Sequence, residues 1–174
     1  MAEQPNSLLH YMADVRPEWI DRNDHMNNSY YLVISQHACL DSIRTWRGDS
    51  APNARGAFGN FITQALVTYI REIRSGTSLR IQCRLSACDA KRAHVYAELI
   101  NSDNGKLAAI VERTSINVLR GHPPKVVPYP EDVFANLKAV MASHAGLPYL
   151  EGRRPLLALT QSKRSLGPAE GEQN

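Results

Sequence analysis

A short polar segment, residues 21–29, holds the densest group of side chains that could do chemistry. Two carboxylates, Asp21 and Asp24, and the imidazole of His25 stand directly before a stretch with a helical pattern. The start of a helix exposes backbone N–H groups and the positive end of the helix dipole. A thioester carbonyl held there would become more electrophilic, and the oxyanion formed on attack would be stabilised. A nearby carboxylate could attack that carbonyl or take a proton from an attacking water.

The same residue types also cap helices, so the segment has a second interpretation. Asn27, Asn28 or Ser29 could each accept a hydrogen bond from the first turn of the helix that follows. The helix is predicted from about Tyr30 to about Trp46, before Gly48. Its apolar residues do not fit one stripe, and a helix that is apolar around most of its girth is expected to be surrounded.

After this helix the pattern becomes extended. We expect strands over residues 58–73, 79–87, 95–99 and 107–119, separated by turns at residues 75–76, 89–91 and 103–105. These runs predict an antiparallel meander, with an earlier extended segment at residues 10–19 pairing at its side. The most economical α+β fold wraps this sheet around the apolar helix. His94 falls on the polar side of its strand and is expected at the surface.

Prolines at positions 123–130 interrupt the chain, and a shorter helix is predicted over residues 131–143. Residues 1–150 are therefore expected to form one domain and residues 151–174 a flexible C-terminal tail. The 174 residues carry 20 Lys+Arg against 17 Asp+Glu. A net charge of +3 is too small to indicate a nucleic-acid partner.

The sequence also bears on the cellular compartment. No apolar stretch is long enough for a membrane span, and no secretory signal is visible at the N-terminus. The three cysteines, Cys39, Cys83 and Cys88, have no metal-binding spacing and are expected to be reduced thiols. These features predict a cytoplasmic protein with no membrane partner.

One motif resembles a known family. The pattern is Asp21-x-x-x-His25-Met26-Asn27-Asn28-x-x-Tyr31. It is similar to the Asp-x-x-Gly-His-Val/Met-Asn-Asn-x-x-Tyr signature of the hotdog acyl-CoA thioesterases related to 4-hydroxybenzoyl-CoA thioesterase. The segment from Tyr69 to Gly76 gives weaker support, because it resembles that family's strand with a charged turn before Gly. The resemblance implies the hotdog fold, an antiparallel sheet wrapped around one long central helix, and hydrolysis of a small acyl-CoA.

Matched position by position, the resemblance implies roles for individual residues. Asp21 corresponds to the catalytic aspartate, acting as nucleophile or general base, and the backbone N–H of Asn28 polarises the thioester carbonyl. His25, Asn27 and Tyr31 match the polar and aromatic positions expected to contact substrate. The chain departs from the family at Asp24, where Gly is usual. Asp24 implies either an altered loop or a second carboxylate that repels the charge of Asp21.

The segment from Pro17 to Asp21 further resembles the branch that includes betainyl-CoA thioesterases. A quaternary ammonium binds well to aromatic faces, and the candidates are Trp19, Tyr30, Tyr31, Trp46 and Tyr69. Packing around the helix is the alternative role for each of these rings. The resemblance implies no metal and no cofactor, since coenzyme A is part of the substrate.

The alternatives to an acyl-CoA thioesterase are a non-catalytic acyl-CoA-binding hotdog module or sensor and, third, a dehydratase of the same fold. An open sheet has an edge strand that a second copy can cover, so a homodimer or homotetramer is expected, with the sites near the subunit boundary.

Overall fold

The computed structural model describes residues 8–48 and 57–159. In chain order the elements are β1 (Leu9–Asp14), the 3-10 turn η1 (Pro17–Trp19), α1 (Asn28–Arg47), β2 (Phe58–Tyr69), β3 (Ser78–Cys88), β4 (Arg92–Asn101), β5 (Leu107–Leu119), β6 (Lys125–Val126), α2 (Glu131–Ala145) and the 3-10 turn η2 (Leu150–Gly152). The helices and long strands lie close to their predicted ranges, except that β2 ends at Tyr69 and residues 70–73, predicted as strand, belong to the connection that follows.

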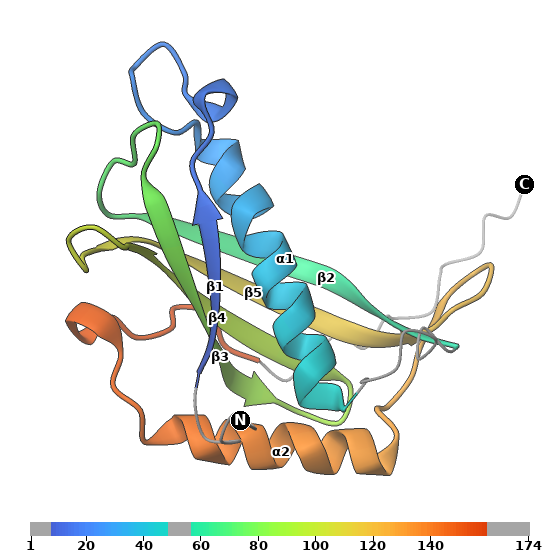
Figure 1. Ribbon diagram of the computed structural model, residues 1–174. Helices are drawn as coiled ribbons and strands as arrows, with labels where there is room; N and C mark the ends of the chain where they lie inside the picture. The colour runs from blue at the N-terminus through green and yellow to red at the C-terminus, as the bar shows by residue number, and fades with distance from the viewer. Residues whose placement is uncertain (1–7, 49–56, 160–174) are drawn as a thin grey trace, which may run out of the picture.

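The strands form one antiparallel sheet in the order β1-β3-β4-β5-β2, with β6 paired to β5. The sheet curves around α1, which lies across its concave face (Figure 1). Residues that alternate along β3, β4 and β5 therefore divide into an inner set facing α1 and an outer set facing away. The predicted α+β fold with one long central helix inside an antiparallel sheet is confirmed.

The expected meander is wrong at one connection. The strands β3, β4 and β5 are sequential neighbours, but β2 pairs with β5 at the far edge and not with β3. Residues 70–77 therefore form a crossover that connects β2, at one edge of the sheet, to β3, which lies beside the strand at the other edge, β1. The turn at Ser75 and Gly76 reverses the chain without joining paired strands, because its backbone bonds go to Val15 at the end of β1 (Gly76 N–H to Val15 C=O, 2.9 Å).

Helix α1 is bounded by a side-chain cap and a left-handed glycine. The side chain of Asn27 accepts a hydrogen bond from the N–H of Ser29, and Gly48 ends the helix with φ of 79°. The helix buries Tyr31, Ile34 and other residues against the sheet. Coverage is incomplete, because Val33 on the opposite side stays 50% exposed.

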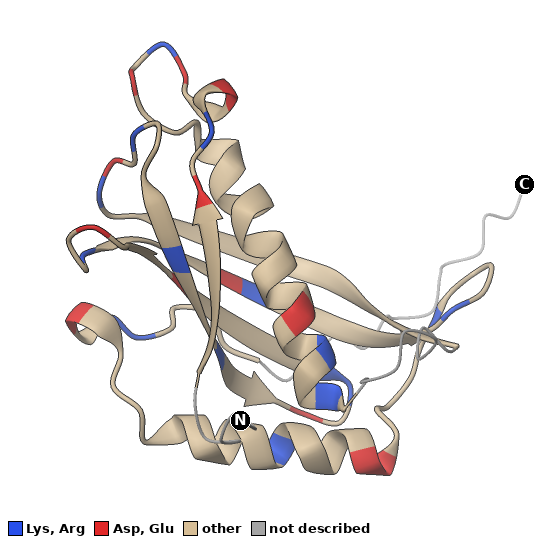
Figure 2. Ribbon diagram, in the orientation of Figure 1, with Lys and Arg blue, Asp and Glu red and all other residues tan. Residues whose placement is uncertain are grey.

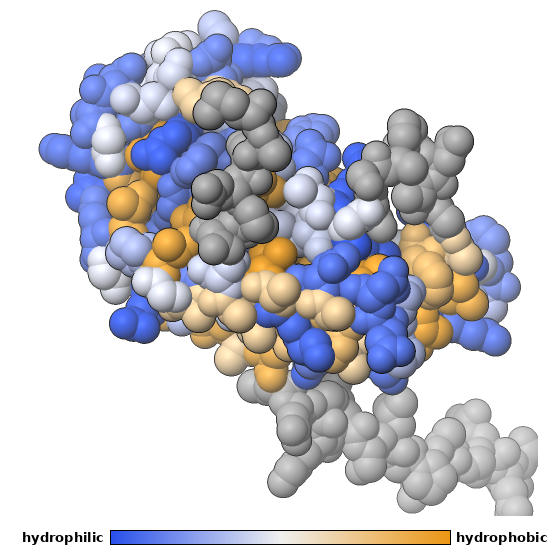
Figure 3. Space-filling view, turned by 60° about the horizontal axis from the view of Figure 1, so that its bottom comes forward, coloured by the Kyte–Doolittle hydropathy of each residue, from blue (hydrophilic) through white to orange (hydrophobic). Residues whose placement is uncertain are grey.

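Helix α2 covers the end of the molecule opposite the start of α1 (Figure 1). Its Val133 and Leu137 join the hydrophobic core between α1 and the inner sheet face. The side that carries α2 presents a mixed polar and apolar surface, as expected for a helix with one buried face (Figure 3).

The chain after α2 runs along the outer sheet face. The guanidinium of Arg84 donates to the carbonyls of His144, Leu147 and Pro148, at 2.7, 3.0 and 2.7 Å. Farther along, the carboxylate of Glu112 accepts the N–H groups of residues 156 and 157 at 2.9–3.1 Å. The predicted tail therefore has its first residues, 151–159, against the sheet, and residues 160–174 lie outside the described residues.

The contacts of this segment correct the expectation for His94. Instead of lying at the surface, His94 is 1% exposed, and its Nε2 lies 3.1 Å from a carboxylate oxygen of Glu112. The C-terminal segment covers this polar side of β4. Within the described residues, no helix is long and apolar enough to cross a membrane.

Candidate active site

The loop before α1 is folded tightly around Asp21. The N–H of Asp21 donates to the carbonyl of His25 at 3.1 Å, and Asp21 Oδ1 accepts the N–H of Asn23 at 2.7 Å. Asp24, at the position where the family has Gly, adopts a left-handed backbone with φ of 62°. Asp tolerates this geometry better than most residues with a side chain. The side chain of Asp24 is exposed and does not line the cleft described below, so Asp24 takes the backbone role of the glycine.

The same loop is anchored to its neighbours through the backbone. Met26 is 2% exposed, and its N–H donates to the carbonyl of Ile73 at 2.7 Å. The N–H of Asn27 donates to the carbonyl of Trp19 at 2.9 Å. These bonds hold the residue 70–77 crossover opposite the start of α1, with Asp21 beside it.

The first turn of α1 leaves one amide at the cleft without an acceptor. Asn27 is the N-cap, so its Oδ1 accepts the N–H of Ser29 at 3.0 Å and its carbonyl accepts that of Tyr30 at 3.0 Å. In the described part of the chain the N–H of Asn28 has no such partner. Asn27, expected to contact substrate, is thus occupied in capping and is absent from the cleft lining.

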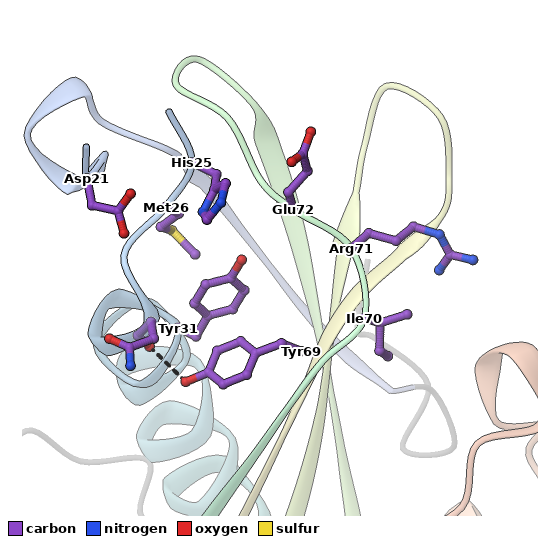
Figure 4. A pocket seen from close by; sticks show the side chains of 9 residues that line it. Asp21, His25, Met26, Tyr31, Tyr69, Ile70, Arg71 and Glu72 are labelled. Carbon is purple, nitrogen blue, oxygen red and sulfur yellow. Dashed lines mark hydrogen bonds between the residues drawn. The ribbon is translucent and has the colours of Figure 1, made fainter. Parts of the chain in front are cut away.

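A cleft of about 500 Å³ opens at this end of α1 (Figure 4). One wall comes from the motif and the start of α1, and consists of Asp21, His25, Met26, Asn28 and Tyr31. The other wall comes from the end of β2 and the crossover, and consists of Tyr69, Ile70, Arg71 and Glu72. The structure thus brings together four of the five expected site residues, Asp21, His25, Asn28 and Tyr31.

Two tyrosines form the floor of the cleft. The rings of Tyr31 and Tyr69 meet edge to face, with centroids 4.9 Å apart and an interplanar angle of 88°. Burial, together with the nearby Tyr69 hydroxyl and the negative charge of Glu72, raises the pKa of Tyr31 to about 12. Tyr31 is therefore a neutral phenol at physiological pH.

The other aromatic candidates lie elsewhere. Trp19 and Tyr30 stack on each other, with centroids 5.4 Å apart, outside the cleft lining. Trp46, near the far end of α1, packs against His144 at 5.5 Å. Of the five aromatic residues considered from the sequence, Tyr31 and Tyr69 are the pair that lines the cleft.

Sequence reasoning missed the second wall as a unit. Neither Glu72 nor Arg71 is among the site residues that the sequence predicts. The available signal was the position of both residues directly after a long strand, within the segment that resembles the family's charged turn. Among the described residues, no cluster of three or more His, Cys, Asp or Glu side chains could hold a metal ion.

A single helix inside an antiparallel sheet, with a carboxylate and, among the described residues, an acceptor-free helix amide in one cleft, is the arrangement expected of a hotdog thioesterase. The chain belongs to the thioesterase-like superfamily, whose family model matches residues 15–137. This membership confirms the resemblance seen in the sequence, and with it the enzyme class, a thioester hydrolase.

Individual relatives agree with this assignment. A betainyl-CoA thioesterase of Pseudomonas aeruginosa is 29% identical over 148 residues, which cover 83% of this chain and 91% of the relative. An L-carnitine dehydrogenase/betainyl-CoA thioesterase of a Rhizobium species is 25% identical over 138 residues, which are 79% of this chain and 27% of that longer protein.

Solved structures show the same fold. A Staphylococcus aureus protein in complex with CoA superimposes with a TM-score of 0.73 and 21% identity, covering 91% of this chain and 98% of that chain. A 1,4-dihydroxy-2-naphthoyl-CoA thioesterase from Synechocystis gives a TM-score of 0.63 and 16% identity, covering 75% of this chain and 96% of that chain.

Proposed function

We propose that this protein hydrolyses a small acyl-CoA thioester to the free acid and CoA, with betainyl-CoA as the leading candidate substrate. The observation that carries the proposal is the placement of the Asp21 carboxylate and the acceptor-free N–H of Asn28 in one cleft. The betainyl-CoA specificity rests on the relatives in Pseudomonas aeruginosa and Rhizobium, whose names include that activity.

The proposed chemistry begins with the thioester carbonyl oxygen at the N–H of Asn28, near the positive end of the α1 dipole. Asp21 then takes a proton from an attacking water, or attacks the carbonyl carbon itself to give a mixed anhydride that water hydrolyses. In either route the oxyanion of the tetrahedral intermediate is stabilised by the Asn28 amide, and CoA leaves as its thiol once protonated. The net reaction consumes one water and yields one acid and one CoA.

The remaining cleft residues have supporting roles in this proposal. His25 borders the cleft beside Asp21, and its backbone carbonyl fixes the Asp21 amide, so it organises the loop and contacts the thioester region. Tyr31 provides a neutral aromatic surface for the acyl group. The mechanism calls on no metal and no cofactor, since CoA enters with the substrate.

We further propose a cytoplasmic homodimer or homotetramer. The free thiols of Cys39, Cys83 and Cys88 suit a reducing compartment. Assembly is supported by the edge position of β2, where Phe61 and Ile62 are 47% and 46% exposed. The same edge leads to Tyr69 in the cleft, which would place the active site near a subunit boundary.

A thiol-release assay tests the proposal. The purified protein is mixed separately with betainyl-CoA, a benzoyl-type CoA and short linear acyl-CoAs, and free CoA is measured over time. We expect turnover of at least one of these esters and its loss in Asp21→Asn. Stabilisation by acyl-CoA in a thermal shift, without thiol release from any ester, would instead establish a non-catalytic binding module.

A further inference from the structure

The charge inside the cleft depends on where Arg71 points. Arg71 belongs to the cleft wall, but its guanidinium extends away from Asp21 and His25 (Figure 4). Its Nη1 donates to the Leu107 carbonyl at 2.5 Å and to both carboxylate oxygens of Glu151 at 2.8 and 3.1 Å. The positive charge is therefore held at the outer side of the crossover, toward the C-terminal segment.

Glu151 is itself fixed by the segment that carries it. Glu151 adopts a left-handed backbone with φ of 52°. The residue before it, Leu150, donates its N–H to Glu98 Oε1 at 2.8 Å, and the carbonyl of Arg153 accepts the Tyr96 hydroxyl at 2.7 Å. Because these bonds join η2 to the outer face of β4, Glu151 is a fixed partner for Arg71.

With Arg71 turned outward, Asp21 and Glu72 are the carboxylates that line the cleft. The two loops that carry them lie near the start of α1, and each loop holds basic as well as acidic positions (Figure 2). Arg74 binds Glu72 through Oε1 alone, at 2.7 and 3.1 Å, and the pair is exposed, so water screens it. Glu72 lines the same cleft as the Tyr31 and Tyr69 rings, from the crossover side (Figure 4). Its negative charge adds to burial and to Tyr69 in raising the pKa of Tyr31.

We propose that Glu72, together with the Tyr31 and Tyr69 rings, selects acyl groups that carry a positive charge, and that Glu151 preserves this selectivity by holding Arg71 outside the cleft. Aromatic faces and a carboxylate both attract a quaternary ammonium, whereas an inward guanidinium would repel it. This inference rests on the proposed function for the reaction, and adds which residues recognise the acyl group.

The test compares two substrates that differ in charge and not in shape. Betainyl-CoA carries a trimethylammonium group, and tert-butylacetyl-CoA carries a carbon in place of the nitrogen. We expect Glu72→Gln to lower the ratio of kcat/KM for the charged ester over the neutral ester by about two- to fivefold, the size expected for a partly exposed charge. The ratio in wild-type protein should also fall as ionic strength rises, because salt screens the partly exposed Glu72.

Glu151→Gln tests the proposal that Glu151 preserves the selectivity by holding Arg71 outside the cleft. Without the Glu151 charge, the Leu107 carbonyl is the remaining partner of Arg71 described above, and the guanidinium can turn toward the cleft more easily. The same ratio should therefore fall by about two- to fivefold. Adding Arg71→Gln removes the released charge and should restore the wild-type ratio, which a general structural defect would not do. Glu131→Gln, an exposed carboxylate in the first turn of α2 at the other end of the molecule, is the charge-matched control and should leave the ratio unchanged.

A binding measurement separates this inference from the hydrolytic function. Choline and its uncharged carbon isostere dimethylbutanol are titrated by NMR against wild type and Glu72→Gln. Preference for choline that depends on Glu72 supports the cation site even if no ester is hydrolysed, in which case only the proposed function fails. Equal binding of the two alcohols, or a kcat/KM ratio that Glu72→Gln does not change, overturns the inference while leaving hydrolysis intact.

Discussion

The hydroxyl of Tyr69 donates a hydrogen bond to the backbone carbonyl of Asn28 across 3.2 Å (Figure 4). The bond joins the last residue of β2 to the first residue of α1, which carries the amide proposed to polarise the thioester. The carbonyl lies in the peptide group between Asn28 and Ser29, next to the one that carries the Asn28 N–H, so a side chain from the opposite wall of the cleft helps to position the backbone of this residue.

Removing this hydroxyl should impair catalysis more than binding. In Tyr69→Phe the ring stays and one hydrogen bond is lost, which corresponds to about 1 kcal/mol, or about a fivefold decrease in kcat. We expect KM and the charged-to-neutral substrate ratio to stay near wild type, since the aromatic face is retained. A rise in KM with kcat unchanged would show that the hydroxyl contacts substrate and does not orient the Asn28 amide.

Replacing Asp21 should abolish most turnover without unfolding the protein. Asp21→Asn keeps the acceptor for the Asn23 N–H but removes the charge, so kcat should fall by a factor of about 10²–10⁴. The free energy of unfolding should change by less than about 0.5 kcal/mol. Thiol release and a denaturant melt measure the two quantities.

The neighbouring carboxylate gives a matched control for Asp21. Asp24→Asn also removes one negative charge from the same loop, and Asn accepts the left-handed backbone at this position. We expect it to retain wild-type kcat. Comparable losses in both variants would mean that net loop charge, and not a specific carboxylate, governs the rate.

The sequence alone determined much of the site, because its chemistry is local. The cap at Asn27 and the carboxylate at Asp21 lie within one short motif, and their positions relative to α1 follow from the start of the helix. The second wall was not predictable in the same way. Glu72 reaches the cleft because β2 pairs with β5 and the crossover returns to Met26, and no local pattern encodes that pairing.

The outer face of the sheet is a second place where the sequence pattern did not predict the surroundings of the residues. Alternation along β4 correctly separated Val95, Ala97 and Leu99 from His94 and Glu98. His94 was expected at the surface, but the C-terminal segment covers this side of β4. A period of two assigns residues to a face of the sheet without specifying what lies on that face.

The Glu112 carboxylate under this segment should contribute to stability in a pH-dependent way. Burial raises its pKa, but hydrogen bonding to His94 and to the N–H groups of Leu156 and Leu157 outweighs burial and leaves the pKa lowered. A lowered carboxylate pKa stabilises the fold above the unfolded value of about 4.3, and this contribution is lost as pH falls through the folded value.

Glu112→Gln tests this contribution. It should lower the free energy of unfolding at pH 7 by about 1–3 kcal/mol, because Gln is a poorer acceptor for the amides it faces. The difference from wild type should shrink as pH falls toward 4 and below. Burial raises the pKa of Glu98, so this carboxylate changes stability with pH in the opposite direction. The contribution of Glu112 is therefore measured as the difference between the variant and the wild type at each pH. A difference that stays constant with pH would contradict the assignment.

The two edges of the sheet allow a direct test of assembly. We expect β2 to be the edge that pairs with a second copy, since it carries the exposed apolar residues Phe61 and Ile62 and leads to the cleft. Ile62→Lys places a charge at that edge and should convert the oligomer to the monomer mass in light scattering. Met12→Lys is the matched control, because Met12 is 65% exposed on β1 at the opposite edge. If Met12→Lys dissociates the protein and Ile62→Lys does not, the interface lies at β1, and the active site is built within one subunit.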